Sequence, residues 1–241
     1  MASEPSTPMA IAVYCGSSAS KRQAHTNAAL SVGRALAQQN RPLVYGGGSH
    51  GLMGIVSNAV LEGGGNVTGI IPFAISAGGG ERSKTTESDM MVVSANAGGK
   101  MQTVMVDSMH ERKVAMAMRS AGFIGLPGGF GTYEEIFEVT TWTQLGIHNK
   151  PVVLLNVLSF FDPIRQLIEN GIAEGYINPA SRRLIVFIDG PTSLDEHENF
   201  DWGKAALEAI DAWQGEDFKP LFDWTRRKDG TSSAQGSLGA S

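Results

Sequence analysis

A glycine-rich turn with acidic residues behind it is the first feature of this sequence that could do chemistry. Residues 126–135 read Leu-Pro-Gly-Gly-Phe-Gly-Thr-Tyr-Glu-Glu and follow the apolar run 122–126. The run has the length of a buried strand, and adjacent glycines let backbone N–H groups approach an anion closely. A helix that opens after the turn adds the positive end of its dipole, which favours an anion at this place.

A second glycine-rich turn, residues 45–54, follows the predicted strand 42–45. Gly46, Gly48 and Gly51 match the dinucleotide fingerprint by spacing, but they follow the second strand, and no acid stands about 20 residues later. We therefore do not expect NAD or FAD. A tight strand-to-helix turn without a ligand is one interpretation; we favour a turn that lines a phosphate or ribose pocket. The two turns together indicate a site for a phosphorylated sugar or nucleotide.

The acids of the later turn have two interpretations. Thr132 and Glu135 have the spacing of a helix capping box, in which both side chains bond to backbone donors. The preceding Pro-Gly-Gly-x-Gly makes a functional role the better interpretation. Because a carboxylate repels phosphate, Glu135 is better placed against a sugar, where it could orient hydroxyls or stabilise positive charge at C1′. Glu134 points about 100° away around the helix and is the weaker candidate.

The segment 107–113, Asp-Ser-Met-His-Glu-Arg-Lys, opens another predicted helix. Helical spacing places Met109, Arg112 and Met116 on one face. An arginine on a methionine face either extends past the core edge to water or is buried with an anion, and the spacing alone does not separate these interpretations. A lysine such as Lys113 is more often a hydrated surface charge.

Other polar groups carry weaker signals. Ser17 and Ser18 follow the first strand and could bind phosphate or cap the next helix. Cys15 has the features of a small buried residue. The five histidines show no metal-ligand spacing, and we find no Walker A turn or Ser-His-Asp order.

Composition bounds the class of protein. The 241 residues fit one domain, and a single cysteine excludes an internal disulfide. A net charge of −5 argues against nucleic acid as the main partner. No run of 18 apolar residues and no signal segment is found, so we expect no membrane contact and a cytoplasmic protein.

The pattern along the chain alternates between strands and helices. We expect strands at 9–14, 42–45, 66–71, 90–93, 122–126, 151–155 and 184–188, and helices at 24–39, 51–62, 107–119, 132–145, 161–174 and 194–213. This predicts a single-domain, Rossmann-like α/β fold, with a parallel sheet and helices on both faces. Ligands then lie beyond the carboxyl ends of the strands, where the glycine turns stand.

The ends and one internal segment fall outside this pattern. We expect residues 1–8 to be disordered, the catalytic domain to span 9–213, and 214–241 to be an extension with a flexible end. Residues 76–88 have the composition of a polar loop.

Four segments in order resemble one known family. They are Pro127–Glu135, similar to a PGGxGTxxE motif, Met109–Lys113, Tyr45–Gly54 and Thr141–His148. The family is the LONELY GUY (LOG) group of cytokinin riboside 5′-monophosphate phosphoribohydrolases, and the resemblance covers residues 10–190. Members have often carried the label lysine decarboxylase, which would require pyridoxal phosphate. Nothing in the sequence supports that cofactor, and we expect none.

The resemblance implies hydrolysis of the N-glycosidic bond of an N6-modified AMP, which gives a free cytokinin base and ribose 5-phosphate. It implies that Arg112 and Glu135 are the catalytic pair, and that Lys113, Thr141 and the turn 129–135 bind the nucleotide. The family often has an acidic substrate contact in the 76–100 region, for which we choose Glu81, with Glu87 as the alternative. The full set of predicted substrate-binding residues is Ser17, Gly47, Gly48, Glu81, Met109, Lys113, Gly128, Gly129, Phe130, Gly131, Thr132, Tyr133, Glu134 and Thr141.

Two alternatives stay open beside this hypothesis. A broader purine nucleosidase would accept AMP itself, and a non-catalytic module would bind nucleotide without releasing ribose 5-phosphate. The resemblance also implies a homodimer.

Overall fold

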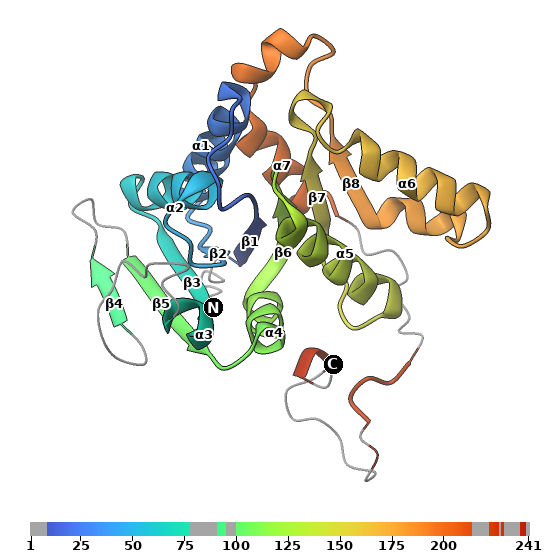
Figure 1. The fold of residues 1–241 in the computed structure, drawn as a ribbon, viewed down its shortest axis with the longest axis horizontal. Helices are drawn as coiled ribbons and strands as arrows, with labels where there is room; N and C mark the ends of the chain where they lie inside the picture. The colour runs from blue at the N-terminus through green and yellow to red at the C-terminus, as the bar shows by residue number, and fades with distance from the viewer. Residues whose placement is uncertain are drawn as a thin grey trace, which may run out of the picture.

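The computed structural model describes residues 9–77, 91–94, 100–213, 222–226, 228 and 237–239 (Figure 1). The strands are β1 (Ala10–Tyr14), β2 (Leu43–Tyr45), β3 (Asn66–Pro72), β4 (Met91–Ser94), β5 (Lys100–Val106), β6 (Ser120–Gly125), β7 (Val152–Leu155) and β8 (Ile185–Ile188). The α-helices are α1 (Gln23–Gln38), α2 (Gly51–Glu62), α3 (Phe73–Ala77), α4 (Met109–Arg119), α5 (Phe130–Leu145), α6 (Asp162–Ala173) and α7 (Trp202–Asp211). Short 3₁₀ turns are η1 (Val157–Ser159), η2 (Pro179–Leu184), η3 (Leu194–Glu198) and η4 (Ser237–Gly239).

The strands form one sheet in the order β4-β5-β3-β2-β1-β6-β7-β8. Every neighbouring pair is parallel except β4 and β5, which pair antiparallel at the edge. The chain moves from β1 toward β2 on one side and reaches β6 on the other. The order therefore reverses between β1 and β6, which is the place where sheets of this kind bind ligands.

Helices cover both faces of the sheet, which confirms the predicted Rossmann-like α/β architecture (Figure 1). Alternate residues of β1 enter different cores: Ile11 and Val13 pack with α1, α2 and α7, whereas Ala12 and Tyr14 pack with α4 and α5. Because both faces are buried, the central strands are apolar without a polar alternation, as parallel strands usually are.

The β5 strand was not predicted. Its sequence, Lys-Met-Gln-Thr-Val-Met-Val, contains few residues with a strong strand preference at its start. It pairs with β3 along seven positions, from Asn66 with Lys100 to Pro72 with Val106, and Met101 is buried in the core. Pairing with a neighbour distant in the sequence, rather than local preference, therefore forms this strand.

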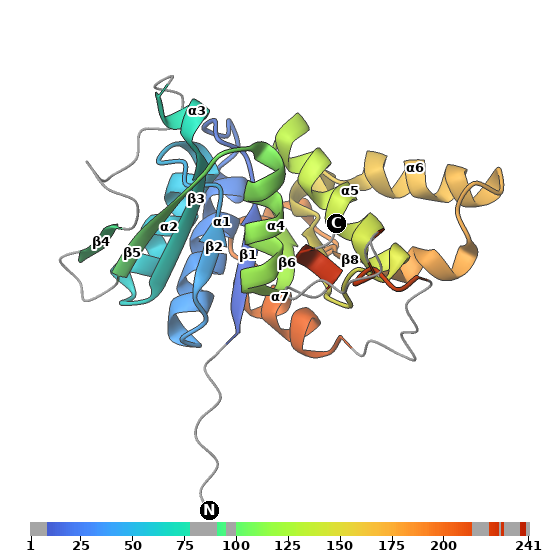
Figure 2. The ribbon, with the colours of Figure 1, turned by 90° about the horizontal axis from the view of Figure 1, so that it is seen from below.

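The termini and the predicted loop are only partly described. Residues 1–8, Glu81 and most of the predicted 76–88 loop lie outside the described residues. Part of the C-terminal extension packs beside α4 and α5: the Trp224 indole donates a hydrogen bond to the Leu145 carbonyl at 2.9 Å, and Leu238 contacts the same core (Figure 2). Among the described helices, none has the length and apolar character needed to cross a membrane.

Candidate nucleotide site

Three turns meet at the carboxyl ends of β1, β2 and β6. The Leu126 N–H donates to the Tyr14 carbonyl at 2.9 Å, and the Gly16 N–H donates to the Pro127 carbonyl at 3.0 Å. The Gly16 carbonyl accepts from the Leu52 N–H, at the start of α2, at 2.9 Å. These hydrogen bonds join the three turns, so that the glycine-rich backbone is held at the point where the strand order reverses.

A cavity of about 310 Å³ opens against these turns. Ser17, Ser18, Gly128 and Gly129 lie on its wall, together with Phe160 from the segment that follows β7. Because α1 begins only at Gln23, neither serine caps that helix, so the capping interpretation is wrong. The serines instead place hydroxyl groups on a cavity of the size of a small ligand.

The helix α5 begins earlier than expected. Its N-cap is Gly129, which offers no side chain to the helix, so the predicted capping box of Thr132 with Glu135 is wrong. Thr132 is buried inside the first turn instead. Gly129 therefore leaves the first N–H groups of α5 without an N-cap side chain, which makes them available to an anion.

The positions of this turn hold glycine for different physical reasons. A Cβ on Gly128 would overlap the Thr132 hydroxyl and lie 2.9 Å from the Gly16 nitrogen, so packing of the protein requires glycine there. A Cβ on Gly129 or Gly131 would meet no atom of the described chain within 4 Å. Protein packing does not explain these two glycines, and open space in front of the backbone is what a close-lying ligand needs.

Arg112 and Glu135 come together beside these turns. Arg112 Nη2 lies 3.6 Å from Glu135 Oε1, with the side chains only 8% and 12% exposed. Arg112 Nη1 also lies 3.9 Å from the sulfur of Met109, which is itself half exposed. Of the two interpretations left open for Arg112, burial with an anion is therefore correct.

Local sequence explains how Arg112 is presented. Ser108 is the N-cap of α4 and accepts a hydrogen bond from the Glu111 N–H at 3.1 Å, while the Glu111 carboxylate accepts from the Asp107 N–H at 2.9 Å. This capping places Arg112 in the first turn of α4. Its guanidinium lies directly on Gly46, where a Cβ would overlap Nη2 and lie 3.1 Å from Cζ. Gly46 is thus a site residue that the sequence singled out only as part of a fingerprint.

The carboxylate of Glu135 changes the electrostatics of two buried neighbours. Burial, and then the charges of Glu135 and Glu138, raise the pKa of Tyr14. Burial and the charge of Glu135 raise the pKa of the Cys15 thiol well above its usual range. Cys15 is buried, as predicted, and its raised pKa keeps the thiol protonated; Glu135 supplies a negative charge suited to positive charge that develops on a substrate.

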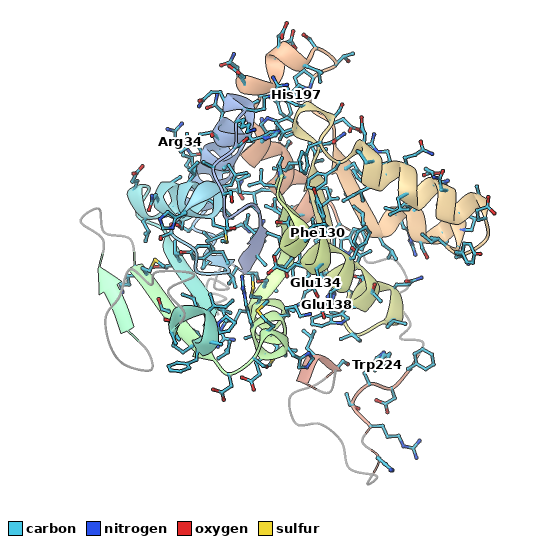
Figure 3. All side chains as sticks on the ribbon, in the orientation of Figure 1. Arg34, Phe130, Glu134, Glu138, His197 and Trp224 are labelled. Atoms are coloured by element: carbon cyan, nitrogen blue, oxygen red, sulfur yellow. The ribbon has the colours of Figure 1, made fainter. Side chains whose placement is uncertain are left out.

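Lys113 is not a hydrated surface charge, in contrast to the usual expectation. Its ammonium group lies 2.6 Å from Glu134 Oε1 and 2.8 Å from Glu138 Oε1, and these glutamates lie on consecutive turns of α5 (Figure 3). Burial lowers the pKa of Lys113, but its hydrogen bonds to the two carboxylates outweigh burial and leave the pKa raised. Glu138 was missed by sequence reasoning; its spacing of four residues from Glu134 was the available signal.

The remaining predicted residues are spread around this centre. Gly47 has a φ of +83° and packs on Ile71, and Gly48 is buried beside it. Phe130 is 92% exposed, and its ring lies 6.3 Å from that of Tyr133.

Thr141 is not brought to the glycine turn. It stands nine positions after Thr132, about 14 Å along the helix, and its hydroxyl donates to the Phe137 carbonyl at 2.8 Å. No group of three or more His, Cys, Asp or Glu side chains suited to a metal is found in the described ranges.

Known proteins are similar to this chain over most of its length. The family model described as "Possible lysine decarboxylase" matches residues 53–197. LOG3 of Arabidopsis thaliana, a cytokinin riboside 5′-monophosphate phosphoribohydrolase, is 46% identical over 185 residues, which are 77% of this chain and 78% of the relative. LOG of Oryza sativa subsp. japonica, named for the same activity, is 44% identical over 185 residues, 77% of this chain and 69% of the relative.

Solved structures share the fold at much lower identity. A molybdenum cofactor carrier protein from Chlamydomonas reinhardtii superposes with a TM-score of 0.54 at 19% identity, covering 85% of this chain and 98% of that one. A molybdenum cofactor binding protein from Rippkaea orientalis gives a TM-score of 0.51 at 18% identity, covering 76% and 91%. The family match over most of the domain, together with relatives of this similarity, has a direct consequence: the chain belongs to the LOG family of cytokinin riboside 5′-monophosphate phosphoribohydrolases.

Proposed function

We propose that this protein hydrolyses the N-glycosidic bond of cytokinin riboside 5′-monophosphates, which are N6-modified AMP molecules. The products are the free cytokinin base and ribose 5-phosphate. The observation that carries the proposal is the buried pair of Arg112 and Glu135 beside the glycine turns, in a chain 44% and 46% identical to two proteins named for this reaction.

The 5′-phosphate binds at the N-terminal end of α5. The uncapped N–H groups after Gly129, the open space before Gly129 and Gly131, and the hydroxyl of Ser17 suit a phosphate group there. Binding energy from the phosphate orients the ribose toward Glu135. A riboside without the phosphate is therefore expected to be a poor substrate.

The chemistry takes place at C1′ of the ribose. When the C1′–N bond breaks, its electron pair leaves with the base and C1′ gains oxocarbenium character, which a fixed carboxylate stabilises. Water adds its oxygen to C1′, one of its protons is lost, and the departing base gains a proton. Glu135 is the carboxylate for this step, and Arg112 holds its orientation through the ion pair.

The proposal also includes assembly and location. The resemblance supports a homodimer, to which the exposed Phe130 and Met109 near the site would contribute apolar surface. A single, buried, unpaired cysteine suits a reducing compartment, which supports a cytoplasmic location.

The test measures release of ribose 5-phosphate from isopentenyl-AMP, AMP and isopentenyladenosine. We expect turnover of isopentenyl-AMP well above that of AMP, and a fall in kcat of about 10²–10³ for Glu135→Gln, the usual loss when one charge-stabilising group is removed. Glu169→Gln is the matched control, because it removes a carboxylate on α6 that forms a surface ion pair with Arg182 of η2.

Each other outcome has a defined meaning. Equal turnover of AMP would identify a general nucleotide nucleosidase. Nucleotide binding without release of ribose 5-phosphate by the folded wild-type protein would refute the enzyme and identify a binding module.

A further inference from the structure

The ion pairs of Lys113 join the two helices of the site. Lys113 is the residue after Arg112 on α4, and its ammonium group contacts Glu134 and Glu138 on α5. The side chain of Lys113 is 17% exposed, so its position is set by these partners more than by water.

The two carboxylates differ in their surroundings. The side chain of Glu134 is 51% exposed and that of Glu138 is 21% exposed. A carboxylate in water holds an ammonium group weakly because solvent screens the pair, whereas a more buried one holds it more strongly. Solvent screening therefore weakens the pair with Glu138 less than the pair with Glu134, although the Glu134 contact is the shorter of the two.

Glu138 also carries an unfavourable feature. Its second oxygen, Oε2, is buried and makes no hydrogen bond to any residue in the described part of the chain. Burial of such an oxygen without a partner destabilises a fold, so stability alone would favour an apolar residue at this position of α5. A carboxylate at position 138 therefore needs a reason other than the stability of the fold, and its contact with the Lys113 ammonium group supplies one.

We propose that Glu138 is a positioning residue, whose carboxylate holds the Lys113 ammonium group in place for the nucleotide substrate. This inference rests on the proposed function, together with the nucleotide-binding role that the family resemblance implies for Lys113. Glu138 acts through Lys113 and touches no reacting atom. It fixes the ammonium group beside α5, so that the substrate anion meets a cation that is already in place.

The first experiment needs no substrate. Limiting acetic anhydride labels exposed and neutral amines, and mass spectrometry of the peptide that contains Lys113 gives its rate relative to Lys21 and Lys228. Removal of the Glu138 charge leaves the amine with the more exposed Glu134 as its remaining ion-pair partner, so we expect Glu138→Gln to raise the labelling rate of Lys113 several-fold and Glu169→Gln to leave it unchanged. An unchanged Lys113 rate in Glu138→Gln would overturn the inference, whatever the enzyme does.

The second experiment separates positioning from folding. In Glu138→Gln we expect the KM for isopentenyl-AMP to rise about tenfold, the loss typical of one hydrogen bond to a charged group, with kcat changed far less. The same substitution in a Lys113→Met background should add almost nothing, since its effect passes through the lysine. Glu138→Leu also removes the unpartnered oxygen, so it should have the same raised KM as Glu138→Gln and a Tm equal to or higher than that of the wild-type protein.

The outcomes of the two experiments are distinct. Faster labelling with an unchanged KM would overturn the positioning role and leave only a structural ion pair. No turnover by wild-type protein would refute the proposed function, and the labelling rates would then still show whether Glu138 holds Lys113.

Discussion

Gly46→Ala should disable the site although it replaces neither Arg112 nor Glu135. The added methyl group would overlap Nη2 of Arg112 and lie 3.1 Å from Cζ. Gly46 directly follows the β2 strand and its backbone is buried, whereas the guanidinium is the end of a long side chain. Arg112 must therefore give way, and it moves off the position from which it contacts Glu135.

The size of the effect follows from the geometry. Contacts below 3.0 Å are not tolerated by real Cβ atoms, so the guanidinium must move by about 1 Å or more. The ion pair is already long at 3.6 Å, and such a shift separates the charges. Misplacement of a catalytic group by about 1 Å costs on the order of a hundredfold in rate, so we expect kcat/KM to fall about 10²-fold.

The assay is ribose 5-phosphate release in a double-mutant cycle with Arg112→Ala. If Gly46 acts through the guanidinium, Gly46→Ala lowers kcat/KM in the wild-type background and has little effect once Arg112 is truncated. Equal losses in both backgrounds would show that the methyl group disturbs the β2 turn itself, and wild-type activity of Gly46→Ala would refute the packing argument.

Three further predictions concern other parts of the molecule. Gly129→Ala adds a methyl group that meets no atom of the described residues, so it should raise the KM for isopentenyl-AMP by about tenfold or more while leaving the Tm unchanged; an unchanged KM would place the phosphate elsewhere. Burial, and then the charge of Lys150, lower the pKa of His148 to about 3, so below about pH 6.5 the unfolded chain takes up a proton that the folded protein does not. The free energy of unfolding should therefore fall by about 2 kcal/mol between pH 6.5 and 5. Urea unfolding of His148→Phe should lack this part of the pH dependence. Trp224→Ala removes a hydrogen bond to the end of α5 and a half-buried ring, and calorimetry should show a loss of about 1–2 kcal/mol, or roughly 2–8 °C in Tm; an unchanged Tm would show that the C-terminal extension does not support α5.

Local patterns in the sequence are sufficient to predict the class of fold and the place of the site. Apolar runs between glycine turns and amphipathic stretches are local signals, and they predict the alternation of strands and helices, including α2 at Gly51–Glu62. The carboxyl ends of parallel strands lie on one edge of a sheet, so two glycine turns after strands are enough to predict a phosphate site there. The motif residues are also specific enough to indicate the family from the amino-acid sequence alone.

Which of these residues touch one another depends on the packing of distant segments. Arg112 lies on α4, which precedes β6 in the sequence, and Glu135 lies on α5, which follows it. Their contact depends on how these two helices pack on the sheet. The contact of Gly46 with Arg112 and the two ion pairs of Lys113 also join segments that are distant in the sequence. The same is true of β5, which forms by pairing with β3. Local patterns record the preferences of a segment, whereas contacts between distant segments depend on strand order, burial and helix packing, which no single segment contains.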